Sequence, residues 1–240
     1  MIQNRKASAA PEAMPKPGRT RTIRLGNFVL APHCHCHICA FFSSPEEEYR
    51  VLLPFVKDGL AEGEKAFHTV NPRRREDHLR HLAAAGIDVT ALNGKGQLEV
   101  RNWTEIHLRD GHFDQDKTLA AFGDILQKNA QEGFPLTRFV THMEWALEKL
   151  PGVDGLLEYE AKANYAWLNQ EGPVHPVICT YDLTKFSGEV VVDVMRTHPM
   201  VIIGGILQEN PFYVPPDKFL LELQKRRSTR MNIRSTSDRN

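Results

Sequence analysis

Residues 37–48 have the sequence HICAFFSSPEEE, and this stretch decides the fold. An apolar strand, His37–Phe42, leads through two serines into a helix that begins at Pro45. This is the layout of a nucleotide-binding strand–loop–helix unit, but the loop contains no glycine and no lysine. A phosphate loop needs glycines so that backbone N–H groups can converge on the phosphates, and a lysine to neutralise them. Here three glutamates, residues 46–48, stand where the anion would lie and complement the helix dipole. We therefore predict a degenerate phosphate-binding loop and no use of ATP.

Strand and helix signals alternate along the rest of the chain. Further strands are predicted at residues 65–70, 97–103, 139–145, 174–181 and 200–207. Helices are predicted at residues 45–63, 71–86, 116–133, 155–169 and 187–196, the first of them capped by Ser44. Repeated strand–helix units with apolar strands indicate an α/β protein with a mainly parallel sheet and helices on both faces.

Composition suggests one folded domain between two basic ends. The 240 residues are 41% hydrophobic, which is enough for a substantial core. Lysine and arginine together number 30, as do aspartate and glutamate, but six basic residues and one acid fall within residues 1–32. Residues 225–240 have the same excess. We expect residues 1–32 to be a disordered basic arm, residues 33–222 the folded domain and residues 223–240 a disordered basic tail.

The apolar segments and the cysteines indicate the cellular compartment of the protein. No run approaches the roughly 20 apolar residues that span a bilayer, and Met1–Lys6 does not resemble a secretory signal. Three of the four cysteines lie at positions 34, 36 and 39, a spacing that suits metal or redox chemistry better than a disulfide framework. We expect a soluble, cytoplasmic protein.

Residues 33–39, HCHCHIC, contain six metal-capable side chains. Alternation along a strand would put four on one face, namely His33, His35, His37 and Cys39. Two or three of His35, His37 and Cys39 could form a soft site for zinc, iron or copper. A hydrogen-bonded core pair of His37 and Cys39, or a thiol that faces a ligand, remain alternatives.

An ordered set of landmarks resembles a known family. The set comprises His37–Phe42, Pro45–Glu47, Phe55–Gly63, Ala85–Asp88, Gly96–Leu98, Gly111–Asp114, Glu144–Leu147, Leu157–Glu160, Tyr181–Asp182, Phe186–Ser187, Thr197–Pro199 and Glu209–Pro216. Together these resemble the MEDS domain, the sensory domain of the dichloromethane-responsive repressor and of many bacterial and archaeal signalling proteins. The resemblance covers about residues 35–220.

That resemblance implies a fold of the RecA/KaiC class without its phosphate loop, and a role in sensing simple hydrocarbon derivatives. The repressor carries a helix-turn-helix ahead of its sensory domain, whereas this sequence has only the basic arm at that place. We therefore expect a sensor or partner-coupled regulator that does not bind DNA directly. His37 and Cys39 match the family motif, and residues 33–36 do not.

In a doubly wound sheet, ligands bind beyond the carboxyl ends of the strands. Side chains expected near these ends, with one at the sheet's rim, form the predicted ligand-binding set: Phe42, Trp103, His142, Glu144, Trp145, Tyr181 and His198. Aromatic walls with a few polar groups are typical of small-molecule pockets. Filling of the core is the alternative role for Phe42 and Trp103, and capping for His198. Glu144 requires a partner if it is buried, and it could be the remnant of the acid that activates water in ATPases of this fold.

The leading functional prediction is a cytoplasmic sensory or regulatory protein. It would bind a small organic ligand, a hydrocarbon derivative, with or without a metal, and signal to a protein partner or within a homo-oligomer. The sequence lacks the common hydrolase, zinc-protease and dinucleotide motifs, so an enzyme is not favoured. Two alternatives remain: a metal- or thiol-dependent enzyme that uses His37, Cys39 and Glu144, and a structural RecA-like interaction module.

Overall fold

A computed structural model describes residues 23–25, 28–30, 36–168 and 174–237. The strands are β1 (Ile23–Leu25), β2 (Phe28–Leu30), β3 (His37–Phe42), β4 (Lys65–Val70), β5 (Leu98–Asn102), β6 (Thr137–His142), β7 (Val177–Asp182), β8 (Met200–Ile203) and β9 (Ile206–Glu209). The α-helices are α1 (Pro45–Ala61), α2 (Arg75–Ala84), α3 (Val89–Gly94), α4 (Trp103–Ile106), α5 (Gln115–Gln131), α6 (Leu156–Leu168), α7 (Gly188–Thr197) and α8 (Pro216–Ser237). Short 3-10 turns are η1 (Pro72–Arg74), η2 (Arg109–Gly111), η3 (Met143–Leu147) and η4 (Val153–Gly155).

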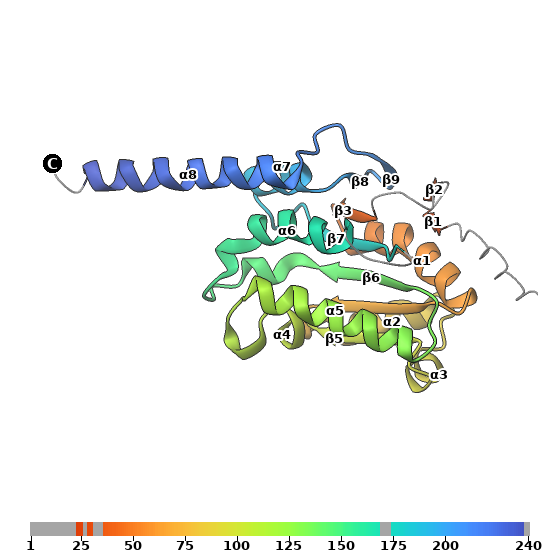
Figure 1. Ribbon diagram of the computed structural model, residues 1–240. Helices are drawn as coiled ribbons and strands as arrows, with labels where there is room; N and C mark the ends of the chain where they lie inside the picture. Colours follow the sequence, from red (N-terminus) through yellow and green to blue (C-terminus); the bar gives the residue numbers. More distant parts are fainter. Residues whose placement is uncertain (1–22, 26–27, 31–35, 169–173, 238–240) are drawn as a thin grey trace, which may run out of the picture.

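The core of the molecule is a seven-stranded sheet with the order β5-β4-β6-β7-β3-β8-β9 (Figure 1). Neighbouring strands are parallel except for β9, which pairs antiparallel with β8. Strands β3 and β7 lie side by side near the middle, with Cys39 opposite Cys179 in register. The predicted fold class, a mainly parallel sheet in an α/β protein, is confirmed.

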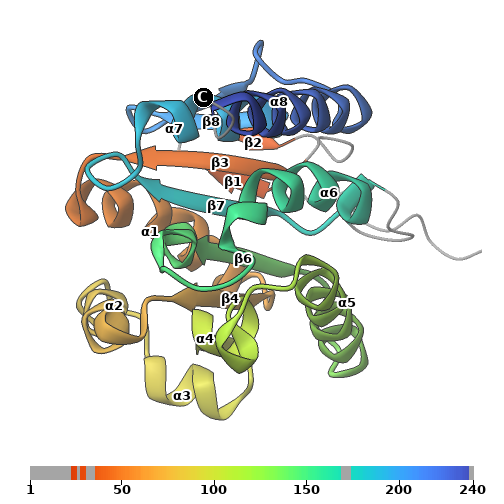
Figure 2. The same ribbon diagram turned by 90° about the vertical axis from the view of Figure 1, so that its left-hand side faces the viewer.

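Helices cover both faces of the sheet (Figure 2). Even-numbered residues of β3 pack with α1, α2 and α3 in one apolar cluster that contains Ile38, Phe55 and Leu82. Odd-numbered residues of β3 face α4–α7 in a second, more aromatic cluster that contains Phe41, Trp145 and Val194. His37 and Cys39 therefore point to the face covered by α4–α7, as alternation along the strand predicts.

The loop after β3 is closed by its own side chains. The Ser44 hydroxyl accepts a hydrogen bond from the backbone N–H of Glu47 at 3.2 Å, which makes Ser44 the N-cap of α1. Reciprocally, the carboxylate of Glu47 accepts from the N–H of Ser43 at 2.8 Å. The pair is similar to a capping box, except that Glu47 binds the N–H of the residue before the N-cap. It engages two of the N–H groups that a phosphate loop would offer to an anion.

Two predicted strand ends were wrong. The segment 200–207, predicted as one strand, is a hairpin of β8 and β9 whose turn uses Gly204 and Gly205 with φ of 58° and 76°. These are left-handed backbone angles that favour glycine. The segment 139–145 also ends early, because β6 stops at His142 and Glu144 and Trp145 belong to η3.

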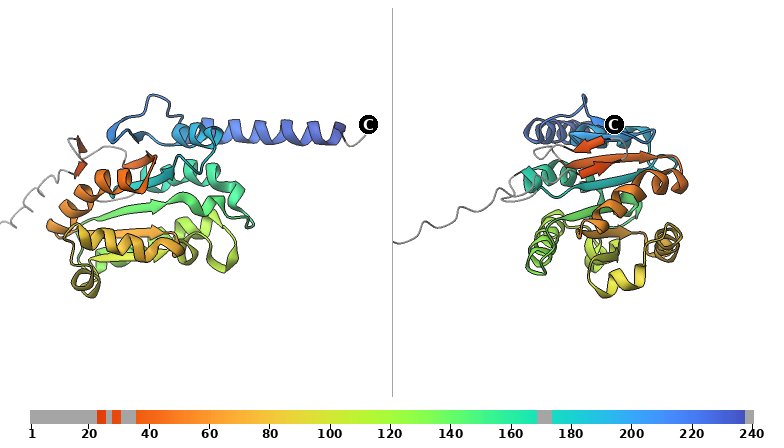
Figure 3. Two further views of the ribbon diagram at one scale, coloured as in Figure 1. Left: turned by 180° about the vertical axis from the view of Figure 1, so that it is seen from behind. Right: turned by 90° about the vertical axis from the view of Figure 1, so that its right-hand side faces the viewer.

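The basic ends also differ from expectation (Figure 3). Within the expected arm, Ile23–Leu25 and Phe28–Leu30 pair antiparallel as β1 and β2. Residues 223–237, expected to belong to a disordered basic tail, are the continuation of α8, a helix that extends beyond the rest of the domain. Only the first part of α8 is packed, since Phe219 is fully buried and residues 224–229 are exposed.

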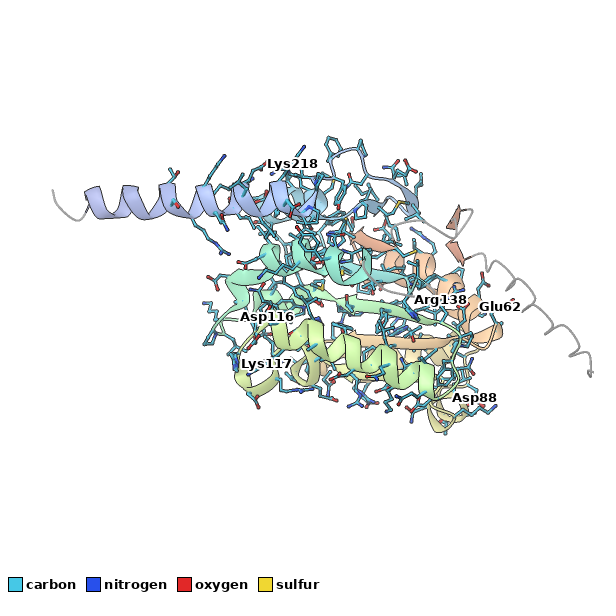
Figure 4. The ribbon with its side chains drawn as sticks, viewed as in Figure 1. Glu62, Asp88, Asp116, Lys117, Arg138 and Lys218 are labelled. Atoms are coloured by element: carbon cyan, nitrogen blue, oxygen red, sulfur yellow. The ribbon has the colours of Figure 1, made fainter. Side chains whose placement is uncertain are left out.

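A buried ion pair fastens α1 to the sheet on the α1–α3 face. Arg138 of β6, labelled in Figure 4, binds the Glu64 carboxylate through Nε at 2.5 Å and the Phe55 carbonyl through Nη1 at 2.6 Å. The α1 backbone approaches closely here, and Gly59 leaves room for the arginine.

Among the helices in the described part of the chain, none is long and apolar enough to cross a membrane.

Candidate metal centre

Four buried side chains from separate elements converge between the sheet and α6. They are His37 at the start of β3, Glu160 on α6, Cys179 on β7 and His198 directly after α7. One ligand atom from each lies within 4.8 Å of all the others. Glu160 and His198 are fully buried, and His37 and Cys179 are almost fully buried, so the cluster lies in the interior of the described part of the chain.

The Glu160 carboxylate is the hub of the cluster. Its Oε2 lies 3.2 Å from Nε2 of His37 and 3.3 Å from Nε2 of His198. The Cys179 sulfur lies 3.5 Å from Nε2 of His37 and 4.0 Å from Oε2 of Glu160. The two imidazole rings are 4.1 Å apart between centroids, so both present Nε2 to the same carboxylate oxygen.

The second nitrogen of each ring is held by a neighbouring group. Nδ1 of His37 lies 3.3 Å from Oδ1 of Asn164, whose amide donates to the Thr197 carbonyl at 2.7 Å. Nδ1 of His198 lies 3.0 Å from the carbonyl of Val194. Such contacts fix ring orientation and leave Nε2 available as a ligand.

Local sequence explains how these groups reach one place. Glu160 and Asn164 are four residues apart on α6, so they share one face of the helix and both point to the sheet. The Asn164 amide also donates to the Glu160 carbonyl at 3.1 Å. Asn210 holds the other side, because its amide donates to the His198 carbonyl at 2.7 Å.

Burial and the shared carboxylate set the protonation states. Burial, followed by the nearby His198, lowers the pKa of His37. Burial alone would raise the pKa of Glu160, but His198 and His37 outweigh it and hold that pKa below the usual range. Burial, and then the charge of Glu160, raise the pKa of the Cys179 thiol well above its ordinary value. In the metal-free chain Glu160 is therefore ionised and Cys179 is protonated at neutral pH.

Among the described residues, the metal ligands predicted from the sequence and this cluster have one residue in common. His37 belongs to it, whereas Cys39 donates its thiol to the Met200 carbonyl at 3.7 Å and lies beside the four. His35 lies outside the described residues. Sequence reasoning missed Glu160 and Cys179 as members of this cluster and placed His198 with the strand ends. The only local signals were the Glu160–Asn164 spacing and the single distant cysteine.

The predicted ligand-binding residues do not form one pocket. Phe42, Glu144 and Tyr181 line a cavity of about 10 Å³ at the carboxyl edge of the sheet, the size of one water molecule. Trp103 and Trp145 belong to the aromatic cluster near α4 and α6. The Tyr181 hydroxyl also contacts Glu160, and His198 belongs to the buried cluster with Glu160.

His142 lies near the carboxyl edge within a group of histidines. Its Nε2 is 2.9 Å from the Glu48 carboxylate, and its ring lies 5.5 Å from that of His78. His78 links the Tyr49 hydroxyl, at 2.9 Å, to Nδ1 of His68, at 2.8 Å. Burial alone would lower the pKa of His142, but Glu48 outweighs it and raises that pKa.

Glu144 is paired with Lys185 at 2.9 Å, at the carboxyl edge of the sheet. His37 begins β3, so it lies toward the opposite, amino-terminal edge of the parallel strands. The structure therefore does not bring together His37, Cys39 and Glu144, the three residues of the alternative enzyme site.

The fold is that of KaiC-like α/β proteins. The structure matches the crystal structure of a KaiC-like protein from the hyperthermophilic archaeon Pyrococcus horikoshii OT3 with a TM-score of 0.54, over 77% of this chain and 80% of that one. Sequence identity is 16%, so the likeness concerns the fold alone.

This chain belongs to the family described as the MEthanogen/methylotroph, DcmR Sensory domain, whose profile matches residues 36–199. It is 27% identical over 170 residues to the transcriptional repressor DcmR of Methylorubrum extorquens (strain DSM 6343 / CIP 106787 / DM4). That alignment covers 68% of this chain and 58% of the repressor, so this chain spans less than two thirds of that relative. Family membership makes residues 36–199 a sensory domain.

Proposed function

We propose that the sensory centre of this protein is a transition-metal ion bound by His37, Glu160, Cys179 and His198. The observation that carries the proposal is the convergence of four ligand atoms within 4.8 Å in a buried site. Two imidazoles, a carboxylate and a thiol are the donor types that zinc, iron and copper accept.

The separations between the ligand atoms favour a tetrahedral ion. Zinc binds nitrogen and oxygen at about 2.0–2.2 Å and sulfur at about 2.3 Å, which puts tetrahedral ligand atoms about 3.3–3.7 Å apart. The separations of His37 Nε2 from Glu160 Oε2 and from Cys179 Sγ are 3.2 and 3.5 Å. Glu160 and Cys179 are slightly farther apart, at 4.0 Å. We therefore take zinc(II), which prefers four tetrahedral ligands of these types, as the proposed ion.

Protonation supports the same assignment. The depressed pKa of Glu160 keeps a negative charge inside a buried site, and burying a charge is costly even when neighbouring groups compensate part of it. A divalent ion would neutralise it and would displace the proton from Cys179, as metal binding to thiols requires.

A second candidate function, binding of a small organic ligand, is favoured by the aromatic cluster beside Glu160. His107 is stacked on Trp145 with ring centroids 4.9 Å apart, and Tyr159 lies against both. In the described part of the chain, both ring nitrogens of His107 and Nε1 of Trp145 are buried without a hydrogen-bond partner. A small neutral molecule with a hydrogen-bond acceptor would satisfy the indole N–H. The test is a thermal-shift assay that compares the melting temperatures of wild type and His107→Phe. Short alcohols, halocarbons and carboxylates are the ligands to be added.

The proposed output is regulation through a partner, in line with the relative that is a transcriptional repressor. The buried thiols suit a reducing, cytoplasmic compartment. The structural interaction module remains the alternative, and it predicts a defined oligomer that binds neither metal nor small ligand.

The deciding experiment is metal analysis of protein purified without a histidine tag and reconstituted with zinc. Wild type, Glu160→Gln, His198→Gln and Cys39→Ser would be compared by inductively coupled plasma mass spectrometry. We expect about one zinc per chain in wild type and in Cys39→Ser, the matched control at a neighbouring buried thiol, and loss of zinc in the other two. Circular dichroism establishes that each variant is folded. Wild type without zinc, or Glu160→Gln with it, would overturn the metal centre.

A further inference from the structure

Helix α8 is held by the two helices that position Glu160 and His198. On the α6 side, Phe219 and Leu223 pack against Ala161, the residue after Glu160. Further along α8, Arg227 binds the Glu158 carboxylate of α6 at 2.9 Å. The base of α8 thus rests on the helical turn that presents the hub carboxylate.

On the α7 side, the contacts lie just ahead of His198. Arg226 binds Asp193 at 2.7 Å, and Glu222 binds Arg196 at 2.7 Å. The Arg196 guanidinium also lies over the Phe219 ring, 5.4 Å from its centroid. The Arg196 carbonyl accepts from the N–H of Val214, in the segment that leads into α8. Asp193 and Arg196 lie within five residues of His198, and their partners lie on α8 or in the segment that leads into it.

From these contacts we infer that α8 is the output element of the sensor, and that its docking across α6 and α7 is coupled to occupancy of the metal centre. The inference rests on the proposed function and adds the structural element through which metal binding would be signalled to a partner. An ion shared by Glu160 and His198 ties α6 to the end of α7, and this is the surface on which α8 lies.

The contact between α8 and the domain is only partly packed. A surface groove of about 280 Å³ lies between α6, α7 and α8, and it is lined by Leu157, Val190 and Leu223 together with Asp193, Arg226 and Arg227. The two anchoring arginines line this groove and are held there by ion pairs. Beyond them, the helix has no packed neighbour in the described part of the chain as far as Thr229 (Figure 1). Because α8 is one continuous helix, a small change in the position of its base would move its far end as part of a rigid rod.

Hydrogen–deuterium exchange of the full chain, with zinc and after its removal by a chelator, tests the coupling. Coupling between two sites typically changes an equilibrium by about 5- to 150-fold. We expect amide exchange in residues 216–229 to slow by at least about fivefold with zinc. Residues 75–84 of α2, on the opposite face of the sheet, serve as the internal control and should not change.

Reciprocity gives a second, independent readout. If zinc favours the docked helix by a given factor, undocking the helix must lower zinc affinity, by up to that same factor. The double variant Arg226→Gln, Arg227→Gln removes both ion pairs, whereas Lys225→Gln changes the charge of an exposed neighbour in the same turn. Competition with a chromophoric chelator should show zinc affinity at least about fivefold weaker in the double variant and unchanged in Lys225→Gln.

The outcomes separate the two ideas. Zinc bound stoichiometrically, with unchanged exchange in α8 and wild-type affinity in the double variant, would overturn the role of α8 and leave the metal centre standing. A wild-type chain that takes up no zinc would overturn the proposed function, and with it this coupling.

Discussion

The hydroxyl of Tyr181 donates a hydrogen bond to Oε1 of Glu160 across 2.5 Å inside the buried centre. This contact holds one carboxylate oxygen and leaves the other, Oε2, to face the two histidines. Burial, and then the charge of Glu160, raise the pKa of Tyr181 well above its ordinary value, so the phenol stays a donor. Tyr181 is thus a positioning group for the hub of the site.

Replacing this donor should loosen the site without removing a ligand. We expect Tyr181→Phe to bind zinc about 10- to 100-fold more weakly, the usual cost of losing a group that orients a metal ligand. Chelator competition measures the effect. Tyr213→Phe, at a partly buried tyrosine near α8, is the control that should keep wild-type affinity. Equal affinity in Tyr181→Phe and wild type would mean that the carboxylate is oriented by other contacts.

Zinc uptake should release a proton from Cys179. Because the thiol is protonated in the metal-free chain and must bind zinc as a thiolate, apparent affinity should rise with pH below the thiol pKa. Calorimetric titration at pH 7.5 in buffers of different ionisation enthalpy should give about one proton per zinc. The same experiment on Cys39→Ser should give the same value. A proton count near zero would exclude the thiol from the ligand set.

Acid should destabilise the fold through buried neutral histidines. Burial lowers the pKa of His107 to about 3, against about 6.5 in an unfolded chain. The stability that this group contributes is therefore complete above pH 6.5 and is lost as pH falls toward 3. By linkage, about 2 kcal/mol is lost between pH 8 and pH 5.

His107→Phe should remove that loss and keep the stacking on Trp145. We expect its free energy of unfolding to exceed that of wild type by about 2 kcal/mol more at pH 5 than at pH 8, measured in urea. His112→Phe, on the same stretch but partly exposed, is the matched control. A His107→Phe difference that does not depend on pH would show that His107 is already charged at pH 5.

Two helical glycines should respond in opposite directions to alanine. A Cβ at Gly59 would lie 2.5 Å from Cδ of Arg138, whereas a Cβ at Gly123 of α5 meets nothing within 4 Å. Gly59→Ala should destabilise the protein by about 1–3 kcal/mol, because the buried arginine must shift. Gly123→Ala should stabilise it by about 0.5–1 kcal/mol through helix propensity. Urea unfolding of both variants checks the pair, and a stabilising Gly59→Ala would show that Arg138 can relocate at little cost.

The strand–helix alternation could be predicted because each element carries its own local signal. Period-two and period-3.6 apolar patterns predicted β4 at its observed bounds and α1, α5 and α7 to within one or two residues. The hairpin of β8 and β9 was missed because apolar residues continue through Gly204 and Gly205. The helix through residues 223–237 was missed because its basic composition gives no apolar stripe.

The centre itself could not be predicted from local pattern. His37 was found because it sits in a conspicuous run of histidines and cysteines. Glu160, in contrast, is one acid among 30 in the chain, and only the packing of α6 on the sheet distinguishes it. Cys39 and Cys179 occupy the same register on neighbouring strands, so choosing between them needs the three-dimensional position of Glu160.

The wide separation of the four clustered side chains along the chain has a consequence for biosynthesis. His37 and Cys179 are 142 residues apart, and His198 comes later still. During translation, His37 is synthesised long before β7, α7 and the residue after α7 have emerged and docked. An ion that requires all four side chains would therefore bind only to a nearly complete fold, and its binding would report that the central strands have come together.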